Sequence, residues 1–361
     1  MKIILFKKPE KRYIVIAIAI IAILILTYIG LTKAKQNQPA EPAPSPVITP
    51  SPKPFETEKP QKKEYIKWVD FNIPYEILEA ALQEDISTYN TDNHIEWITI
   101  LSYLGAKCGG QYNKIGIKDI YAFTERLKSG EPLEEITKDM KYFKYYTEAY
   151  DAVLGEFVGE YSINMDGEWK NTYGLKVFSP IAEGYDYSHY DDFGANRSYG
   201  YKRKHLGHDM MGSIGTPIVA VESGYVETVG WNQYGGWRIG IRSFDKKRYY
   251  YYAHLRKDHP YHKDLKEGNI VKAGDVIGYL GMTGYSVKEN VNNIDTPHLH
   301  FGMQLIFDES QKEGTNQIWI NLYDITTLLQ KHKVTVYKNE DEKEYYRKYD
   351  FKEELLEFTK N

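Results

Sequence analysis

Cysteine is almost absent from this sequence: Cys108 is the only one among 361 residues. A single cysteine excludes an intramolecular disulfide and a zinc site built from several thiolates. The sequence also lacks an excess of one charge, because 46 basic residues stand against 50 acidic residues. Without a strongly basic surface, we expect no nucleic-acid partner.

Proline is scarce outside one segment, since eight of the 15 prolines lie within residues 36–63. Such a composition cannot form a core and predicts an extended linker. A polyproline-II chain of this length could hold the next domain up to ~80 Å from its anchor. Composition sets stiffness and not purpose, so a spacer reaching into a wall-like layer and a passive linker both remain open.

Charge is absent from residues 13–31, a run of 19 mostly apolar residues. As a helix this run would span ~29 Å, close to the ~30 Å hydrocarbon core of a bilayer. Basic residues dominate residues 1–12, and the positive-inside rule then places the N-terminus in the cytoplasm and the later domains outside. The alternative is a cleaved signal peptide, but the run is long and no small-residue cleavage site follows. We predict a single-pass anchor in the cell membrane.

Residues 65–165 carry apolar residues at helical spacing and predict an all-α domain of four helices. Glu84, Asp85 and Glu96 could suggest a second, glycan-cleaving activity. No motif fixes their mutual geometry, so we interpret them as a solvated helix face, and His94 as a surface residue. A protein partner for this domain remains possible.

After Gly167 the hydrophobic period changes from 3.6 to 2, and short β-rich segments follow between turn residues. This spacing predicts an antiparallel β-sandwich or barrel, and the charged tail is expected to add a surface helix. We therefore predict a multi-domain chain with six parts. These are a cytoplasmic basic segment (1–12), a transmembrane helix (13–31), a Pro-rich linker (32–64), an all-α domain (65–165), an all-β domain (166–332) and a charged C-terminal tail (333–361).

Chemistry is indicated by histidines at strand spacing. His298 and His300 are two residues apart, so in a strand their side chains face the same side. One imidazole can bind zinc while the other accepts and returns a proton of the attacking water. An HxH pair alone is weak evidence, because two exposed strand histidines fit it equally well. Upstream, His205 and Asp209 form an HxxxD whose spacing lets both reach one cation, and His254 closes a strand between these motifs.

A hydrolytic zinc site needs three protein ligands and an open position for water. His205, Asp209 and His300 meet that count and are the predicted ligands of Zn²⁺. His254 and His298 then remain as unliganded bases.

These motifs resemble the lysostaphin/LytM-type zinc metallopeptidases, a family that cuts peptide cross-links of bacterial peptidoglycan. The resemblance covers about residues 178–323 and is specific because separate motifs occur in order. It implies the duplicated hybrid motif fold, zinc on the same three ligands, and His298 and His254 flanking the water and the oxyanion. The matching motifs are FGANR (193–197), HLGHD (205–209), GTPIVAV (215–221), YAHL (252–255), VKAGDVIG (271–278), GMTG (281–284) and PHLHF (297–301).

The chain departs from the family pattern in its loops. Residues 285–296 stand where the family has only a few residues, which lengthens one wall of the expected groove. A second loop holds His259 and His262, and its proline favours solvated histidines over a metal site. His208, within HxxxD, is expected to point elsewhere. Gly302 stands where the family often has an acidic residue.

Two functions fit these features. The first is a zinc endopeptidase acting on peptide stems or cross-bridges of peptidoglycan outside the cytoplasmic membrane, with His298 as the base and His254 at the oxyanion. The second is a non-catalytic wall-binding scaffold or hydrolase activator that uses the same groove. All five site residues are retained, which favours catalysis. A lipoyl-like or phosphotransfer domain, suggested by residues 271–278, is disfavoured by the predicted outward topology.

Overall fold

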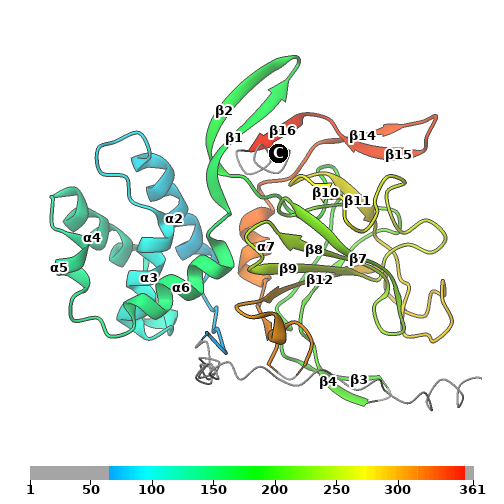
Figure 1. The fold of residues 1–361 in the computed structure, drawn as a ribbon, viewed down its shortest axis with the longest axis horizontal. Coiled ribbons are helices and arrows are strands. Elements are labelled where there is room, and N and C mark those ends of the chain that lie inside the picture. Colours follow the sequence, from blue (N-terminus) through cyan, green and yellow to red (C-terminus); the bar gives the residue numbers. More distant parts are fainter. Residues whose placement is uncertain (1–64, 200, 315, 354–361) are drawn as a thin grey trace, which may run out of the picture. The chain divides into compact units, whose positions relative to one another are not determined.

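The computed structural model describes residues 65–199, 201–314 and 316–353 (Figure 1). The predicted basic segment, membrane span and linker, residues 1–64, lie outside the described residues. No helix within the described ranges is long and apolar enough to cross a membrane. The described residues belong to one unit with a helical part and a β-rich part, which confirms the predicted combination of the two.

The helical part follows the predicted apolar periodicity. Buried residues of the first two helices recur at three- and four-residue spacings, as expected of helices with one face in a core. The predicted fourth helix is instead two helices, because the amides of Met140 and Phe143 bond to carbonyls three residues earlier and close tight turns. The helices of this part are α2 (Tyr75–Thr88), α3 (Trp97–Cys108), the short η1 (Tyr112–Lys114), α4 (Ile117–Lys128), α5 (Leu133–Thr137) and α6 (Phe143–Leu154).

Asp85 does not lie on a solvated face, so that prediction was wrong. Its carboxylate is buried and accepts hydrogen bonds from the Trp97 amide at 2.8 Å and the Tyr173 hydroxyl at 2.8 Å. The Nε2 atom of His94 lies 2.7 Å from the same carboxylate. A buried carboxylate must be hydrogen-bonded, and these partners join α2, the start of α3 and a β-strand. Asp85 therefore has a structural role here.

The β-rich part is built on a seven-stranded antiparallel sheet with the order β10-β7-β8-β9-β12-β13, in which β5 also pairs with β12. Leu299, Phe301 and Met303 of β12 are buried in the core, so the alternate residues face the other side. The central strands are β5 (His208–Met211), β6 (Pro217–Val219), β7 (Gly224–Asn232), β8 (Gly236–Ser243), β9 (Arg248–Ala253), β10 (Ile270–Val271), β11 (Val276–Tyr279), β12 (His298–Leu305) and β13 (Ile318–Trp319).

The tail forms strands where a surface helix was predicted. Aromatic residues alternate with charged ones there, which favours strands, and Phe351 is buried against Tyr161 and Phe178. The strand that holds Phe351 pairs with β1, inside the range predicted to be helical. The remaining elements are β1 (Val158–Met165), β2 (Glu168–Leu175), β3 (Asn196–Tyr199), β4 (Tyr201–Lys204), η2 (Glu309–Gln311), α7 (Tyr323–Leu329), β14 (Val336–Asn339), β15 (Glu344–Arg347) and β16 (Asp350–Glu353).

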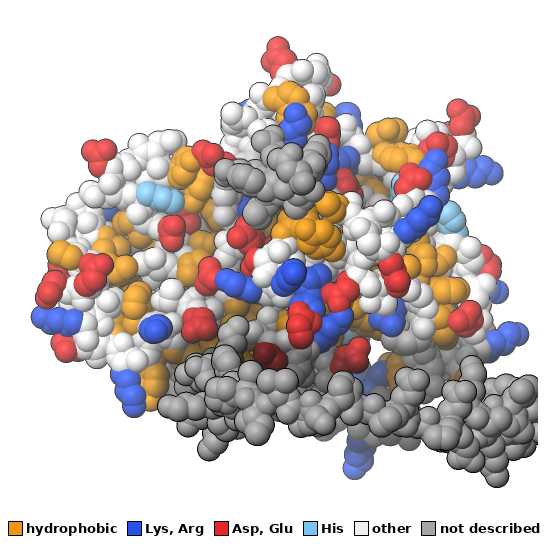
Figure 2. All heavy atoms as spheres, in the orientation of Figure 1, with side chains coloured by type: hydrophobic (Ala, Val, Ile, Leu, Met, Phe, Trp, Pro, Cys, Tyr) orange, Lys and Arg blue, Asp and Glu red, His pale blue; other side chains and the backbone are white. Residues whose placement is uncertain are grey.

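A buried ion pair joins the helical part to the sheet. The Arg248 guanidinium donates to Glu222 at 2.8 Å and to the carbonyl oxygen of Ala152, the residue two before the end of α6, at 2.8 Å. Both ionic side chains are buried, and each is the partner that makes burial of the other tolerable. On the face shown in Figure 2, acidic and basic side chains are interspersed, which agrees with the balanced composition.

Candidate metal centre and active site

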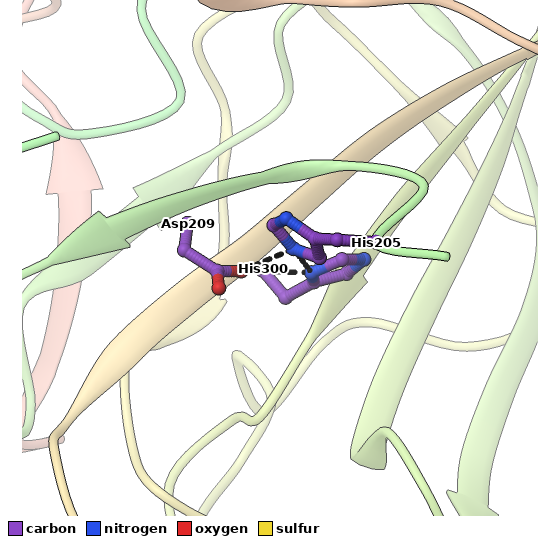
Figure 3. Close-up of side chains that lie close together, drawn as sticks. All are labelled: His205, Asp209 and His300. Carbon is purple, nitrogen blue, oxygen red and sulfur yellow. Dashed lines mark hydrogen bonds and ion pairs between the residues drawn. The ribbon is translucent and has the colours of Figure 1, made fainter. Parts of the chain in front are cut away.

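The three predicted metal ligands meet at the junction of β5 and β12. His300 of β12 lies directly opposite Asp209 of β5 in the strand register, and opposite residues of an antiparallel pair share a face. His205 lies in the loop that leads into β5, so a tight loop and not a helical turn spans the HxxxD spacing. Figure 3 shows the three side chains directed toward one another.

The distances between the candidate ligand atoms suit one cation. Nδ1 of His300 lies 2.8 Å from Oδ1 of Asp209, and Nε2 of His205 lies 3.0 Å from that oxygen and 3.1 Å from His300 Nδ1. Ligand atoms ~2.0–2.1 Å from a tetrahedral zinc are ~3.3 Å apart, so a small adjustment would accommodate the ion. Among the described residues, this is the cluster of His, Cys, Asp or Glu side chains that could hold a metal.

Glycine inside HxxxD permits this approach. A Cβ atom on Gly207 would lie 2.5 Å from Cε1 and Nε2 of His300, closer than any side chain tolerates. The His300 ring therefore packs against bare backbone and presents Nδ1 to the other two ligands.

Two residues that the sequence analysis did not single out orient the ligands. Asp192 Oδ1 lies 2.9 Å from Nδ1 of His205, and Arg197 pairs with Asp192 and, at 3.2 Å, with Asp209. An outer carboxylate of this kind fixes the tautomer of a ligating histidine, leaving its Nε2 free for a metal. Burial works against the charge of Asp209, but hydrogen bonds from His205 and His300 hold its pKa below the ordinary value. Only the FGANR resemblance, which contains Arg197, pointed to this segment.

His298 and His254 lie beside the ligand cluster in similar surroundings. Nδ1 of His298 donates to the Thr296 carbonyl at 2.8 Å, and Nδ1 of His254 donates to the Thr283 carbonyl at 2.9 Å. The two rings are 4.8 Å apart between centroids. Because Nδ1 carries the proton in each ring, Nε2 is the proton acceptor when the ring is neutral.

His298 lies further from Asp209 than the predicted ligand His300 does. Its Nε2 lies 3.8 Å from Asp209 Oδ1, against 2.8 Å for the ligand atom of His300. This extra ångström suits a side chain that contacts water next to a metal better than one that binds the metal.

His254 holds a left-handed backbone conformation, with φ 61°, immediately after β9. Such a conformation costs of order 1–3 kcal/mol for a non-glycine residue and persists where surrounding contacts impose it. Gly284 faces the ring, since a Cβ there would lie 3.0 Å from His254 Nδ1. Burial, and then the nearby charges of His298 and His300, hold the pKa of His254 well below its ordinary value, so the ring is neutral near pH 7.

The other histidines lie outside the cluster. As expected, His208 points to the opposite face, where its Nε2 lies 2.7 Å from Nδ1 of His189, and burial lowers its pKa to about 3. His259 is half-exposed and pairs with Glu344 at 2.9 Å. His262 is buried, so the prediction of a solvated side chain was wrong for that residue.

A cavity of about 840 Å³ opens over the cluster. One wall comes from the long loop, residues 285–296, as predicted, and another from the β3–β4 hairpin. The two walls touch, because Arg203 of β4 donates to the Tyr285 hydroxyl and lies 4.9 Å from the Tyr285 ring centroid.

Residues 203–314 match the family described as Peptidase family M23. The L-Ala–D-Glu endopeptidase of Bacillus subtilis is 40% identical over 124 residues, 34% of this chain and 36% of that protein. Lysostaphin of Staphylococcus simulans is 36% identical over 135 residues, 37% of this chain and 22% of that protein. Glycyl-glycine endopeptidase ALE-1 of Staphylococcus capitis is 34% identical over 139 residues, 38% of this chain and 31% of that protein.

The chain thus spans little more than a third, or less, of the length of each of these relatives. The matched range contains all five predicted site residues. Residues 203–314 therefore match a peptidase family M23 domain and are similar in sequence to parts of the L-Ala–D-Glu endopeptidase and of lysostaphin.

Proposed function

We propose that this protein is a zinc endopeptidase that hydrolyses a peptide bond in peptidoglycan. The observation that carries the proposal is the juxtaposition of a His, Asp, His cluster fit for one cation with two further histidines whose Nε2 atoms are proton acceptors. The relatives' names differ in the bond they cut, L-Ala–D-Glu in one and glycyl-glycine in another. The bond cut by this chain is therefore a separate question.

In this proposal His205, Asp209 and His300 would hold Zn²⁺, which when bound supplies an acidified water and a polarised carbonyl. His298 Nε2 takes the proton of the attacking water and later delivers it to the leaving amine. His254 Nε2 can donate to the developing oxyanion only after gaining a proton, because its Nδ1 proton is engaged with the Thr283 carbonyl. The ring centroids lie 4.8 Å apart, and the proton that His298 takes from the water is the one proton that this step supplies to the two rings.

Digestion of purified walls tests this function. Zinc-loaded full-length protein should release peptides from walls of at least one cross-link type, and sequencing the new termini identifies the bond. EDTA treatment should stop the release and added Zn²⁺ should restore it. Binding to walls without release of peptide from any cross-link type would favour the scaffold alternative.

We also propose that residues 13–31 anchor the protein in the cytoplasmic membrane with the peptidase domain outside. The support is the uncharged 19-residue run after a basic segment. A protease added to intact spheroplasts should therefore degrade the domain that follows Pro60. The assignment is overturned if that domain survives until the membrane is lysed, while an authentic external protein is digested in the same sample.

A further inference from the structure

The cavity over the metal cluster is rich in cationic side chains. Arg197 and Lys312 are paired with carboxylates, Arg197 with Asp192 and Asp209, and Lys312 with Glu227. The other three cations that line the cavity, Arg203, Lys204 and Arg238, have no acidic partner within the part of the chain that the structure describes. The five cations that line the cavity are Arg197, Arg203, Lys204, Arg238 and Lys312, against the carboxylates of Asp209, Asp295 and Glu313.

Arg238 is the cation that the sheet itself places beside the candidate ligands. It precedes Ile239, which pairs with Tyr252, and the next residue of β9, Ala253, pairs with His300. Arg238, Ala253 and His300 therefore lie in one row across β8, β9 and β12. These three strands are neighbours in the sheet (Figure 1). Strands are ~4.8 Å apart, so the Cα atoms of Arg238 and His300 are ~10 Å apart with only a methyl side chain between them.

Two tyrosines of β9, Tyr249 and Tyr251, lie near the Arg238 side chain. Burial raises the pKa of the Tyr249 and Tyr251 hydroxyls, and the charge of Arg238 works against that rise. The Nε atom of Arg238 is buried and has no hydrogen-bond partner among the described residues. Arg238 is half-buried and has no acidic partner among the described residues, so an anion brought by a ligand would gain a charged hydrogen-bond donor there.

Gly302, which stands where the family often has an acidic residue, lies two residues beyond His300 on the same face of β12, and a Cβ there would lie 2.8 Å from the Trp319 ring. Trp319 therefore lies over β12, and its indole forms a wall of the cavity next to His300.

We propose that Arg238 is a specificity-determining residue that binds a free carboxylate of the substrate close to the scissile bond. This inference rests on the proposed function and narrows its substrate class. An extended peptide advances ~3.3 Å per residue, so the long arginine side chain reaches a carboxylate within one or two residues of a carbonyl held at the metal. A D-Glu joined through its γ-carboxyl keeps such a carboxylate free. A glycine bridge or an amidated residue offers none.

The test compares two synthetic stem peptides that differ only in this group, one with the free carboxylate and one with the carboxamide. Zinc-loaded full-length wild-type protein, Arg238→Gln and Arg238→Lys are assayed for kcat/KM on both peptides. Lys266→Gln is the control, because this exposed lysine loses the same charge outside the cavity.

Wild-type protein should prefer the carboxylate peptide by about 10-fold or more, the range for a hydrogen bond to a charged group. Arg238→Gln should lose that preference, because kcat/KM falls far more on the carboxylate peptide than on the amidated one, and Arg238→Lys should keep part of it. Lys266→Gln should match wild type. Equal cleavage of both peptides by wild-type protein, or an undiminished preference in Arg238→Gln, overturns the proposal and leaves the proposed function standing.

If no variant cleaves either peptide, the wall digestion described above decides the proposed function, and calorimetric binding of the same peptides decides the inference. Tighter binding of the carboxylate peptide by wild type than by Arg238→Gln supports the carboxylate site. Equal binding by the two proteins refutes it.

Discussion

Asp209→Ala should leave less than about a tenth of the zinc of wild-type protein, for which we expect about one ion per chain. The reason is geometric, since Oδ1 of Asp209 lies within 3.0 Å of the ligand atoms of both His205 and His300 and is central to the cluster. His205→Ala should have the same effect. Without the metal the water is not acidified, so wall hydrolysis should fall by roughly 10³-fold or more.

Zinc content measured by mass spectrometry after gel filtration provides a result independent of activity. His259→Ala is the matched control, because that half-exposed side chain pairs with Glu344 away from the cluster. It should retain one zinc per chain. Full zinc content in both ligand variants, together with loss from His259→Ala, would relocate the metal to the loop that holds His259 and His262.

The site was predictable from sequence because its motifs are local. HxH in a strand fixes a common face, and HxxxD fixes two ligand types within five residues, so pairing β5 with β12 brings them together. Asp192 and Arg197 obey no such spacing rule. Asp192 lies 13 residues before the histidine it contacts, and only the folded loop shows that contact. The roles of ligand and base stay predictions, which zinc content and hydrolysis of the variants test.

The fold, too, was predictable where local sequence patterns determine it and not where distant contacts do. One of the short β-rich segments of the sequence, Gly224 to Trp231, differs from β7 by one residue, because β-branched and aromatic residues dominate it. The prediction of a surface helix in the tail was wrong because the many charges of the tail resemble those of a solvated helix. Burial of Phe351 against Tyr161 and Phe178 instead determines its conformation. The prediction that Asp85 is solvated was wrong for a related reason. Its burial depends on partners in α3 and β2 that lie far along the chain.

His298→Ala should keep its zinc and its fold but lose wall hydrolysis by roughly 10²-fold or more. Its Nε2 lies 3.8 Å from Asp209 Oδ1, outside the ligand cluster, and its Nδ1 contact is to a backbone carbonyl. Removing it should therefore delete a general base without removing a ligand. Zinc content, thermal unfolding and peptide release on the same samples distinguish these effects.

His254 requires a different substitution, because alanine is strained at φ 61°. Asparagine tolerates the left-handed conformation, and its amide can still donate to the Thr283 carbonyl that now bonds His254 Nδ1. His254→Asn should therefore stay folded and zinc-loaded while turnover falls roughly 10²–10³-fold, with wall binding less affected, as for loss of an oxyanion donor. The catalytic assignment fails if zinc-loaded wild type, His298→Ala and His254→Asn all bind walls equally and release no peptide. That result would identify the groove as a binding site for wall peptides.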